Sequence, residues 1–144
     1  MTSQEFHDLV EGNTKDSGEG GNDSHLTLDQ LAQLERQKGI QFPSAYKDFL
    51  SRYGAGDFGS LTVLSPDPKS EFPIWETTAR LENRECGFLS VVEIDSDYYG
   101  FLIEQGVCSN DLWSVEFGYQ IYYMEYPDFF DFLARVALGI SEEQ

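Results

Sequence analysis

The two histidines of the chain test the simplest forms of enzymatic chemistry. His7 lies before, and His25 at the end of, a polar segment over residues 11–24 that contains no apolar side chain. A Ser-His-Asp or Cys-His mechanism needs an imidazole that a rigid scaffold holds against its nucleophile. We therefore expect neither histidine to act in catalysis. Pairs of carboxylates are equally uninformative, because a chain with 26 acidic residues brings some of them together by chance.

The remaining chemical motifs are incomplete. Residues 95–100, DSDYYG, begin like a calcium loop, but Tyr99 stands at position 5 and Gly106 at position 12, where a bidentate Glu is required. The glycine-rich residues 54–59 follow a predicted helix and precede a predicted strand, the reverse of a phosphate-binding loop. Cys86 and Cys108 have no close Cys or His, so a zinc site is not expected. We predict no catalytic residue, no metal and no cofactor, and interpret 95–97 as an acidic turn.

The charge balance indicates the kind of partner. With 26 acidic and 9 basic residues, the formal net charge is −17. Such a charge repels nucleic acid and anionic membranes, because binding to phosphates requires Lys and Arg. It attracts cationic proteins and accelerates their association. The alternative is that the acidity serves solubility alone, since charge constrains partners better than it defines function.

Exposed acidic and aromatic side chains are therefore the candidates for binding. Aromatic residues of a sheet protein usually pack in the core or across strands, but Trp and Tyr also dominate interaction hot spots. We expect Trp75 to be exposed, because prolines and charged residues surround it in the sequence. The predicted binding surface combines a glycine loop, a proline-rich loop and the acidic turn. Its residues are Asp57, Phe58, Asp67, Glu71, Trp75, Asp95, Asp97 and Tyr98.

The elements that position these residues follow from periodicity and caps. A short helix is predicted over 3–10, and a flexible linker over 11–24. A capped helix begins after Thr27, buries Leu28, Leu31 and Leu34, and ends at Gly39. A second helix begins at Pro43, at its first helical position, and ends near 54.

The later part of the chain alternates like a sheet. Strands are predicted over 61–64, 88–94, 98–104, 112–117 and 119–124, with a loop over 65–73, a possible helix over 77–85, and a closing helix from Pro127 to near Gly139. This order predicts an α+β fold with N-terminal helices, an antiparallel, meander-like sheet of four to six strands covered on one face, and a C-terminal helix. Residues 1–25 form a short helix and linker, and residues 26–140 form the domain.

Compartment and assembly follow from what the composition lacks. The N-terminus has no signal-peptide pattern, and no apolar stretch approaches the ~18 residues of a membrane span. Two cysteines fit a reducing compartment. We expect a soluble cytoplasmic protein that is a monomer or a weak dimer.

A resemblance covers about residues 26–139. Residues 31–59 are similar to the opening signature of the SUKH (SMI/KNR-type) superfamily, in which a helix leads into a Gly-Ile-x-hydrophobic-Pro element, a Tyr-Lys-x-Phe-Leu helix and a Tyr-Gly-x-Gly end. The matching residues are Gly39, Ile40, Phe42, Pro43, Tyr46, Lys47, Phe49, Leu50, Tyr53, Gly54 and Gly56. Residues 95–102 and 112–117, with Phe129, Phe132 and Leu133, resemble its later landmarks.

The resemblance implies an α+β fold and a non-enzymatic role. Many members of the superfamily are immunity proteins, which bind and neutralise a cognate bacterial toxin in the cytosol of the producing cell. Many of those toxins are nucleases with basic grooves, which an acidic inhibitor suits. The superfamily also contains eukaryotic regulators of cell-wall synthesis, so a regulatory adaptor or scaffold that binds an endogenous protein is the alternative.

Overall fold

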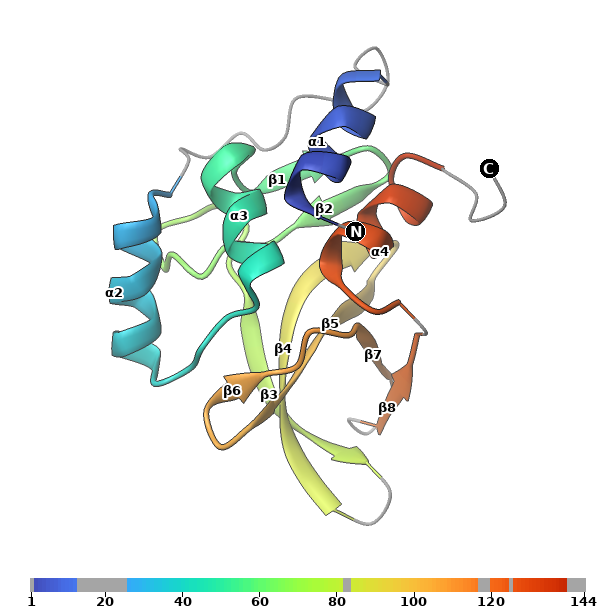
Figure 1. The fold of residues 1–144 in the computed structure, drawn as a ribbon. Helices are drawn as coiled ribbons and strands as arrows, with labels where there is room; N and C mark the ends of the chain where they lie inside the picture. Colours follow the sequence, from blue (N-terminus) through green and yellow to red (C-terminus); the bar gives the residue numbers. More distant parts are fainter. Residues whose placement is uncertain (1, 13–25, 82–83, 117–119, 125, 140–144) are drawn as a thin grey trace.

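The computed structural model of the protein describes residues 2–12, 26–81, 84–116, 120–124 and 126–139 (Figure 1). The predicted linker lies outside these ranges from residue 13 onward. The described helices are α1 (Ser3–Gly12), α2 (Leu28–Lys38), α3 (Ser44–Arg52) and α4 (Phe129–Val136). The described strands are β1 (Gly56–Phe58), β2 (Leu61–Val63), β3 (Trp75–Leu81), β4 (Arg84–Ile94), β5 (Asp97–Glu104), β6 (Val107–Cys108), β7 (Trp113–Glu116) and β8 (Gln120–Tyr123).

Local signals set the bounds of α2. The Thr27 hydroxyl accepts a hydrogen bond from the Gln30 amide at 3.1 Å, and the Gln30 side chain accepts one from the Thr27 amide at 2.8 Å. This reciprocal capping box satisfies two amides that a helix start leaves unpaired. Gly39 ends the helix with a φ of 68°. Leu31 is buried as predicted, but Leu28 is 57% exposed, and its neighbours Thr27 and Asp29 at the start of the helix are exposed as well.

The helix α3 begins one residue later than predicted. Pro43 is its N-cap and has an extended backbone, so Ser44 is the first helical residue. Its apolar residues Tyr46, Phe49 and Leu50 are buried and form one face of the helix.

The N-terminal helix α1 is part of the domain core. Its Phe6 ring is 1% exposed and stacks on Phe130 of α4 with 4.9 Å between ring centroids. Val10, one turn further along, is also buried. These contacts join α1 to α4, as Figure 1 shows. The predicted division of the chain after residue 25 therefore does not separate α1 from the packing of the domain.

The sheet has eight strands in the order β1-β2-β4-β3-β8-β7-β5-β6, with β4 also paired to β5. The α+β class is confirmed, and the strand number exceeds the predicted four to six. The possible helix over 77–85 is wrong: β3 and β4 form an antiparallel hairpin there. The two short strands β1 and β6 were not predicted, because three and two residues are too few for a visible alternation.

The strand β4 organises the sheet. One of its edges pairs with β3 over 84–90 and with β2 over 92–93, and its other edge pairs with β5. A bulge between Ser90 and Val92 separates the two partners on the first edge. Near the turn of the β3–β4 hairpin, Arg80 of β3 also forms a parallel pairing with Gln120 of β8. The pairings β4–β5–β7–β8–β3 therefore return to β4, which curls the sheet.

Each face of the sheet carries a hydrophobic cluster. The inner face, as we name the side on which the helices pack, contributes residues such as Leu89, Val92 and Phe101 to the main core with all four helices. The other side, the outer face, carries a second cluster made only of strand residues. Its buried members are Cys86, Phe88, Leu102, Val115 and Ile121. Since no helix residue belongs to this cluster, the curl of the sheet itself buries it.

Candidate functional site

The histidine His7 is held more firmly than the sequence indicated. In α1, its Nδ1 lies 2.9 Å from the hydroxyl of Tyr53, and its Nε2 lies 3.5 Å from a carboxylate oxygen of Glu11. The fold therefore positions His7, but against a phenol and a carboxylate, and not against the Ser or Cys that a Ser-His-Asp or Cys-His mechanism needs. Burial, the largest cause, raises the pKa of the Tyr53 phenol. A phenol that holds its proton more tightly is a poorer nucleophile at neutral pH. The contact between His7 and Tyr53 instead joins α1 to the C-terminal end of α3.

Burial keeps the thiol of Cys108 from forming a reactive thiolate. Cys86 and Cys108 are both buried, and neither forms a disulfide within the described residues. Burial, with smaller effects of Glu76 and Glu35, raises the pKa of Cys108 to about 12. The thiolate is the nucleophile and the metal ligand, so Cys108 is inert near neutral pH. The described residues also contain no group of three or more His, Cys, Asp or Glu that could hold a metal ion.

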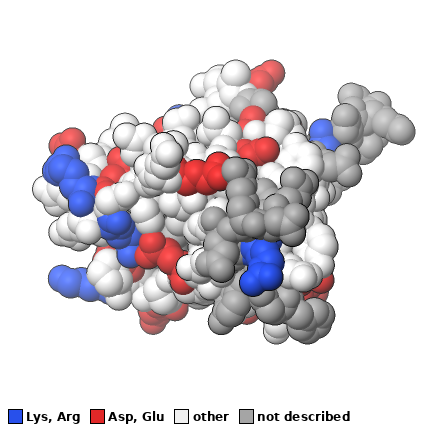
Figure 2. All heavy atoms as spheres, turned by 90° about the horizontal axis from the view of Figure 1, so that it is seen from below, with Lys and Arg blue, Asp and Glu red and all other residues white. Residues whose placement is uncertain are grey.

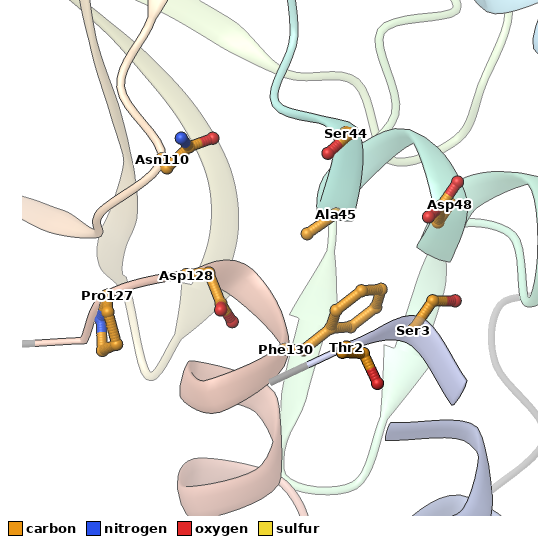
Figure 3. Close-up of a pocket in the computed structure, with 9 residues that line it drawn as sticks. All are labelled: Thr2, Ser3, Ser44, Ala45, Asp48, Asn110, Pro127, Asp128 and Phe130. Atoms are coloured by element: carbon orange, nitrogen blue, oxygen red, sulfur yellow. The ribbon is translucent and has the colours of Figure 1, made fainter. Parts of the chain in front are cut away.

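A polar hollow of about 350 Å³ lies where the N-terminal ends of α1, α3 and α4 meet (Figure 3). Asp48 of α3 and Asp128, the N-cap of α4, lie on opposite sides of it, with Phe130 between them. The Asp128 carboxylate already accepts a hydrogen bond from the Asp131 amide at 2.8 Å. The hollow therefore combines helix caps with hydroxyl groups, and its lining has no His, Lys, Arg or Cys to act with them.

The sequence-predicted acidic turn is present and lies at one end of the sheet. Asp95 and Ser96 connect β4 to β5, with φ values of 49° and 74°. Positive φ at both central residues is typical of a two-residue type I′ hairpin turn. The interpretation of 95–97 as a turn and not a calcium loop agrees with this geometry.

A cluster of carboxylates surrounds this turn. Tyr98 of β5 is opposite Val115 of β7, and continuing that register by one residue places Asp97 opposite Glu116. Burial raises the pKa of the Tyr99 phenol, and the negative charges of Asp97 and Glu116 raise it further. The charge of Asp95 acts on the pKa of the Tyr99 phenol in the same direction. We name Asp95, Asp97 and Glu116 the acidic strand end.

The acidic strand end lacks compensating charge in the part of the chain that the structure describes. There, no ion pair and no side-chain hydrogen bond involves the carboxylates of Asp95, Asp97 or Glu116. The ion pairs that are present involve helices, such as Lys38 with Glu76 at 3.6 Å. Figure 2, which views the opposite end of the sheet, shows basic and acidic side chains mixed on that surface. Negative charge is thus left unpaired where β4 turns into β5.

The structure brings together some predicted binding residues and separates others. Phe58 is wrong as a surface residue, because its side chain is fully buried and packs against Phe49 with 5.1 Å between centroids. Trp75 is half-buried at the start of β3, where its ring contacts Tyr98 at 5.1 Å, so it is less exposed than predicted. Asp57 lies on the outer face, where its carboxylate accepts a hydrogen bond from the Thr62 hydroxyl at 3.0 Å.

The two predicted acidic residues of the proline-rich loop lie apart from the sheet. A short neck, in which the Ser65 amide donates to the Phe72 carbonyl at 2.6 Å, closes this loop beside β4. Asp67 caps a turn within the loop by accepting from the Lys69 amide at 2.9 Å, and Glu71 is exposed. In the described structure, no hydrogen bond or ion pair joins either residue to the acidic strand end.

Two acidic residues near the site were missed by the sequence reasoning. Glu116 is opposite Asp97 by register, and Glu93 is opposite Tyr98 on the outer face. The alternation of side chains along a strand shows which face of the sheet each residue lies on. Which residue of the neighbouring strand lies opposite it follows only from the strand order.

The comparisons with known proteins give one result. A family model described as SUKH_5, SMI1-KNR4 cell-wall, matches residues 6–138. The searches of curated proteins and of solved structures returned no match. Within the described residues, every helix is too short or too polar to cross a membrane.

Proposed function

The chain belongs to the SMI1-KNR4 family (SUKH), and from this we propose that it is a non-enzymatic immunity protein. In this role it binds a cognate bacterial toxin domain in the cytosol and blocks its activity. We propose a cationic toxin, such as a nuclease whose groove binds phosphates. The carboxylates of the immunity protein would occupy the positions of those phosphates.

The acidic strand end is the observation that supports a cationic partner. Asp95, Asp97 and Glu116 form a group of like charges that nothing in the described structure neutralises. Like charges directly opposite each other on neighbouring strands destabilise a sheet. A basic partner removes that cost on binding. The overall charge of −17 extends the same attraction to longer range and steers the encounter.

We propose that the contact surface extends from this end of the sheet onto its outer face. Asp57 and Tyr98 lie there in one cross-strand row, through Thr62 and Glu93. Trp75 adjoins that row through its contact with Tyr98. Asp67 and Glu71 remain proposed contributors from the neighbouring loop.

Co-expression with the product of an adjacent toxin gene tests this function. The expected result is that the chain restores growth of the host and co-purifies with the toxin. Absence of both outcomes contradicts the immunity role. Binding to an endogenous protein without any rescue would favour the alternative, a regulatory adaptor, for which the cell-wall wording of the family description is the supporting observation.

The site itself is tested with variants that preserve the hairpin. Because Asp95 has a positive φ, which Asn tolerates, the double variant Asp95→Asn/Asp97→Asn removes two charges without a new strain. We expect toxin association to slow roughly threefold or more at low salt, with the effect shrinking as salt rises. The control is Asp8→Asn/Asp29→Asn, which removes two charges from exposed positions of α1 and α2. Equal effects of both doubles would place the contact elsewhere.

A further inference from the structure

The outer face carries a row of aromatic residues whose rings remain partly exposed to solvent. Neighbouring strands place five residues in register across the sheet, since each pairs with the next. In order, these are Trp75, Ser90, Gly100, Trp113 and Tyr123. Two small residues at the centre are thus flanked by large rings on both sides.

The centre of this row is kept small by the backbone. A Cβ at Gly100 would lie 1.8 Å from the Leu89 carbonyl oxygen, so no other residue fits there without a shift of the strand. Ser90 beside it is fully buried, and its hydroxyl has no hydrogen-bond partner in the described structure. The surface between the two tryptophans is therefore low and rigid, and it contains a buried hydroxyl, that of Ser90, without a hydrogen-bond partner in the described structure.

The rings along the row are paired and remain partly accessible. Trp75 contacts Tyr98 edge-on, with 5.1 Å between centroids and 80° between ring planes. Trp113 contacts Tyr123 at 5.0 Å, and Tyr123 is 49% exposed. Trp75, Tyr98 and Trp113 are half-buried, because they also pack on the second cluster beneath them. We name Trp75, Tyr98, Trp113 and Tyr123 the aromatic row.

Negative charge borders the aromatic row. Glu93 is opposite Tyr98 on the same face, and the Asp111 carboxylate lies 3.4 Å from the indole nitrogen of Trp113. In the described part of the chain, the one guanidinium over an aromatic ring is that of Arg135, which lies 5.6 Å from the Tyr126 ring. That contact is on α4, so among the described side chains the aromatic row has neighbouring carboxylates but no cation–π contact.

We propose that the aromatic row is the docking surface for an arginine-bearing segment of the protein partner. A guanidinium stacks on the faces of Trp and Tyr, and nearby carboxylates accept its N–H groups. Aromatic platforms also stack nucleobases, but those sites pair their rings with basic residues, whereas here the bordering charges are acidic. This inference takes from the proposed function only that the partner is a protein.

The two tryptophans report on this surface directly. The chain has two tryptophans, Trp75 and Trp113, and both belong to the aromatic row. The full chain is titrated with a short glycine–arginine peptide while tryptophan fluorescence is recorded. A second peptide carries citrulline, which has the shape of arginine without its charge, at each arginine position. We expect a saturable change with the arginine peptide and an affinity at least tenfold weaker for the citrulline peptide.

Neighbouring tyrosines on β8 provide a matched pair of variants. Tyr123 and Tyr122 are 49% and 47% exposed, but Tyr122 pairs with Ser114 and lies on the opposite face. We expect Tyr123→Ala to weaken binding of the arginine peptide about fivefold, the effect of one cation–π contact at a partly exposed position, and Tyr122→Ala to leave it unchanged. Both variants are checked for an unchanged unfolding midpoint.

Three outcomes of the binding titrations would overturn the proposal. They are equal affinities for the two peptides, equal effects of the two tyrosine variants, and tighter binding of an oligothymidine than of the arginine peptide. Rescue from the toxin that is insensitive to Tyr123→Ala would also reject this surface while leaving the immunity role intact. Arginine binding without rescue would support the surface and reject the immunity role.

Discussion

Removing one charge from the acidic strand end should make the protein more stable. The register places Asp97 opposite Glu116, and directly opposed residues on antiparallel strands have Cβ atoms about 4.5–5.5 Å apart. For charges about 6 Å apart, repulsion is about 0.7 kcal/mol in bulk water and about 3 kcal/mol at an effective dielectric of 20. Both side chains are exposed, so the lower end applies. We expect Asp97→Asn to raise the free energy of unfolding by about 0.5–1 kcal/mol.

Urea denaturation measures this gain. With a slope of about 2 kcal/mol per molar, the midpoint should rise by about 0.25–0.5 M. The control, Glu71→Gln, removes one charge from the exposed loop between β2 and β3, and so corrects for the lower net charge. In about 1 M salt, where the screening length is about 3 Å, the difference between the two variants should nearly vanish. A gain no larger than that of the control, or one that survives high salt, would refute the facing of Asp97 and Glu116.

Three further predictions concern buried and strained groups. Burial raises the pKa of Cys108 from 9.0 to about 12, so the native state keeps a proton that the unfolded state loses. Stability should therefore fall as pH rises above about 9, by up to about 1.4 kcal/mol per pH unit, and Cys108→Ala should flatten that part of a stability–pH curve. Ser96→Gly should stabilise the fold by roughly 1 kcal/mol and so raise the thermal midpoint, because Ser96 has a φ of 74°, which glycine adopts without strain. A loss of stability would contradict the turn geometry. Tyr46→Phe should cost about 1–3 kcal/mol in urea denaturation, because the buried Tyr46 hydroxyl donates to the Leu64 carbonyl; a neutral effect would show that this carbonyl finds another donor.

The helices could be predicted because their signals are local. The capping box of Thr27 and Gln30 and the positive φ of Gly39 act within a few residues of the ends they define. The hairpin of β3 and β4 could not, since residues 77–85 show no alternation of apolar side chains. Their strand conformation depends on pairing between the two halves of the segment and on the rest of the sheet. Tertiary pairing outweighs local propensity in such a case.

The residues of the proposed binding surface can be chosen from the sequence, but their geometry cannot be derived from it. Trp75 looked exposed because its sequence neighbours are polar, yet the ring that covers it belongs to Tyr98, on another strand. Phe58 looked like part of a glycine loop, but β1 alternates and turns this side chain inward while Asp57 turns outward. Glu116 joins Asp97 only once β7 is known to lie beside β5. The contact of Trp75 with Tyr98 and the facing of Asp97 and Glu116 depend on strand order, which a single sequence does not contain.

Departures from the rules of stable folding gather on one hairpin. Two of the three described non-glycine residues with positive φ, Asp95 and Ser96, form its turn. Asp97, next in the chain, opposes a like charge, and Ser90 of the same hairpin has a buried hydroxyl without a partner in the described structure. Natural sequences tend to break such rules at functional sites and satisfy them elsewhere, as the capping box of α2 does here. A hairpin retained only for stability would have Asn-Gly in its turn and opposite charges across its strands. The β4–β5 hairpin has neither, which favours selection for contact with a partner over selection for stability.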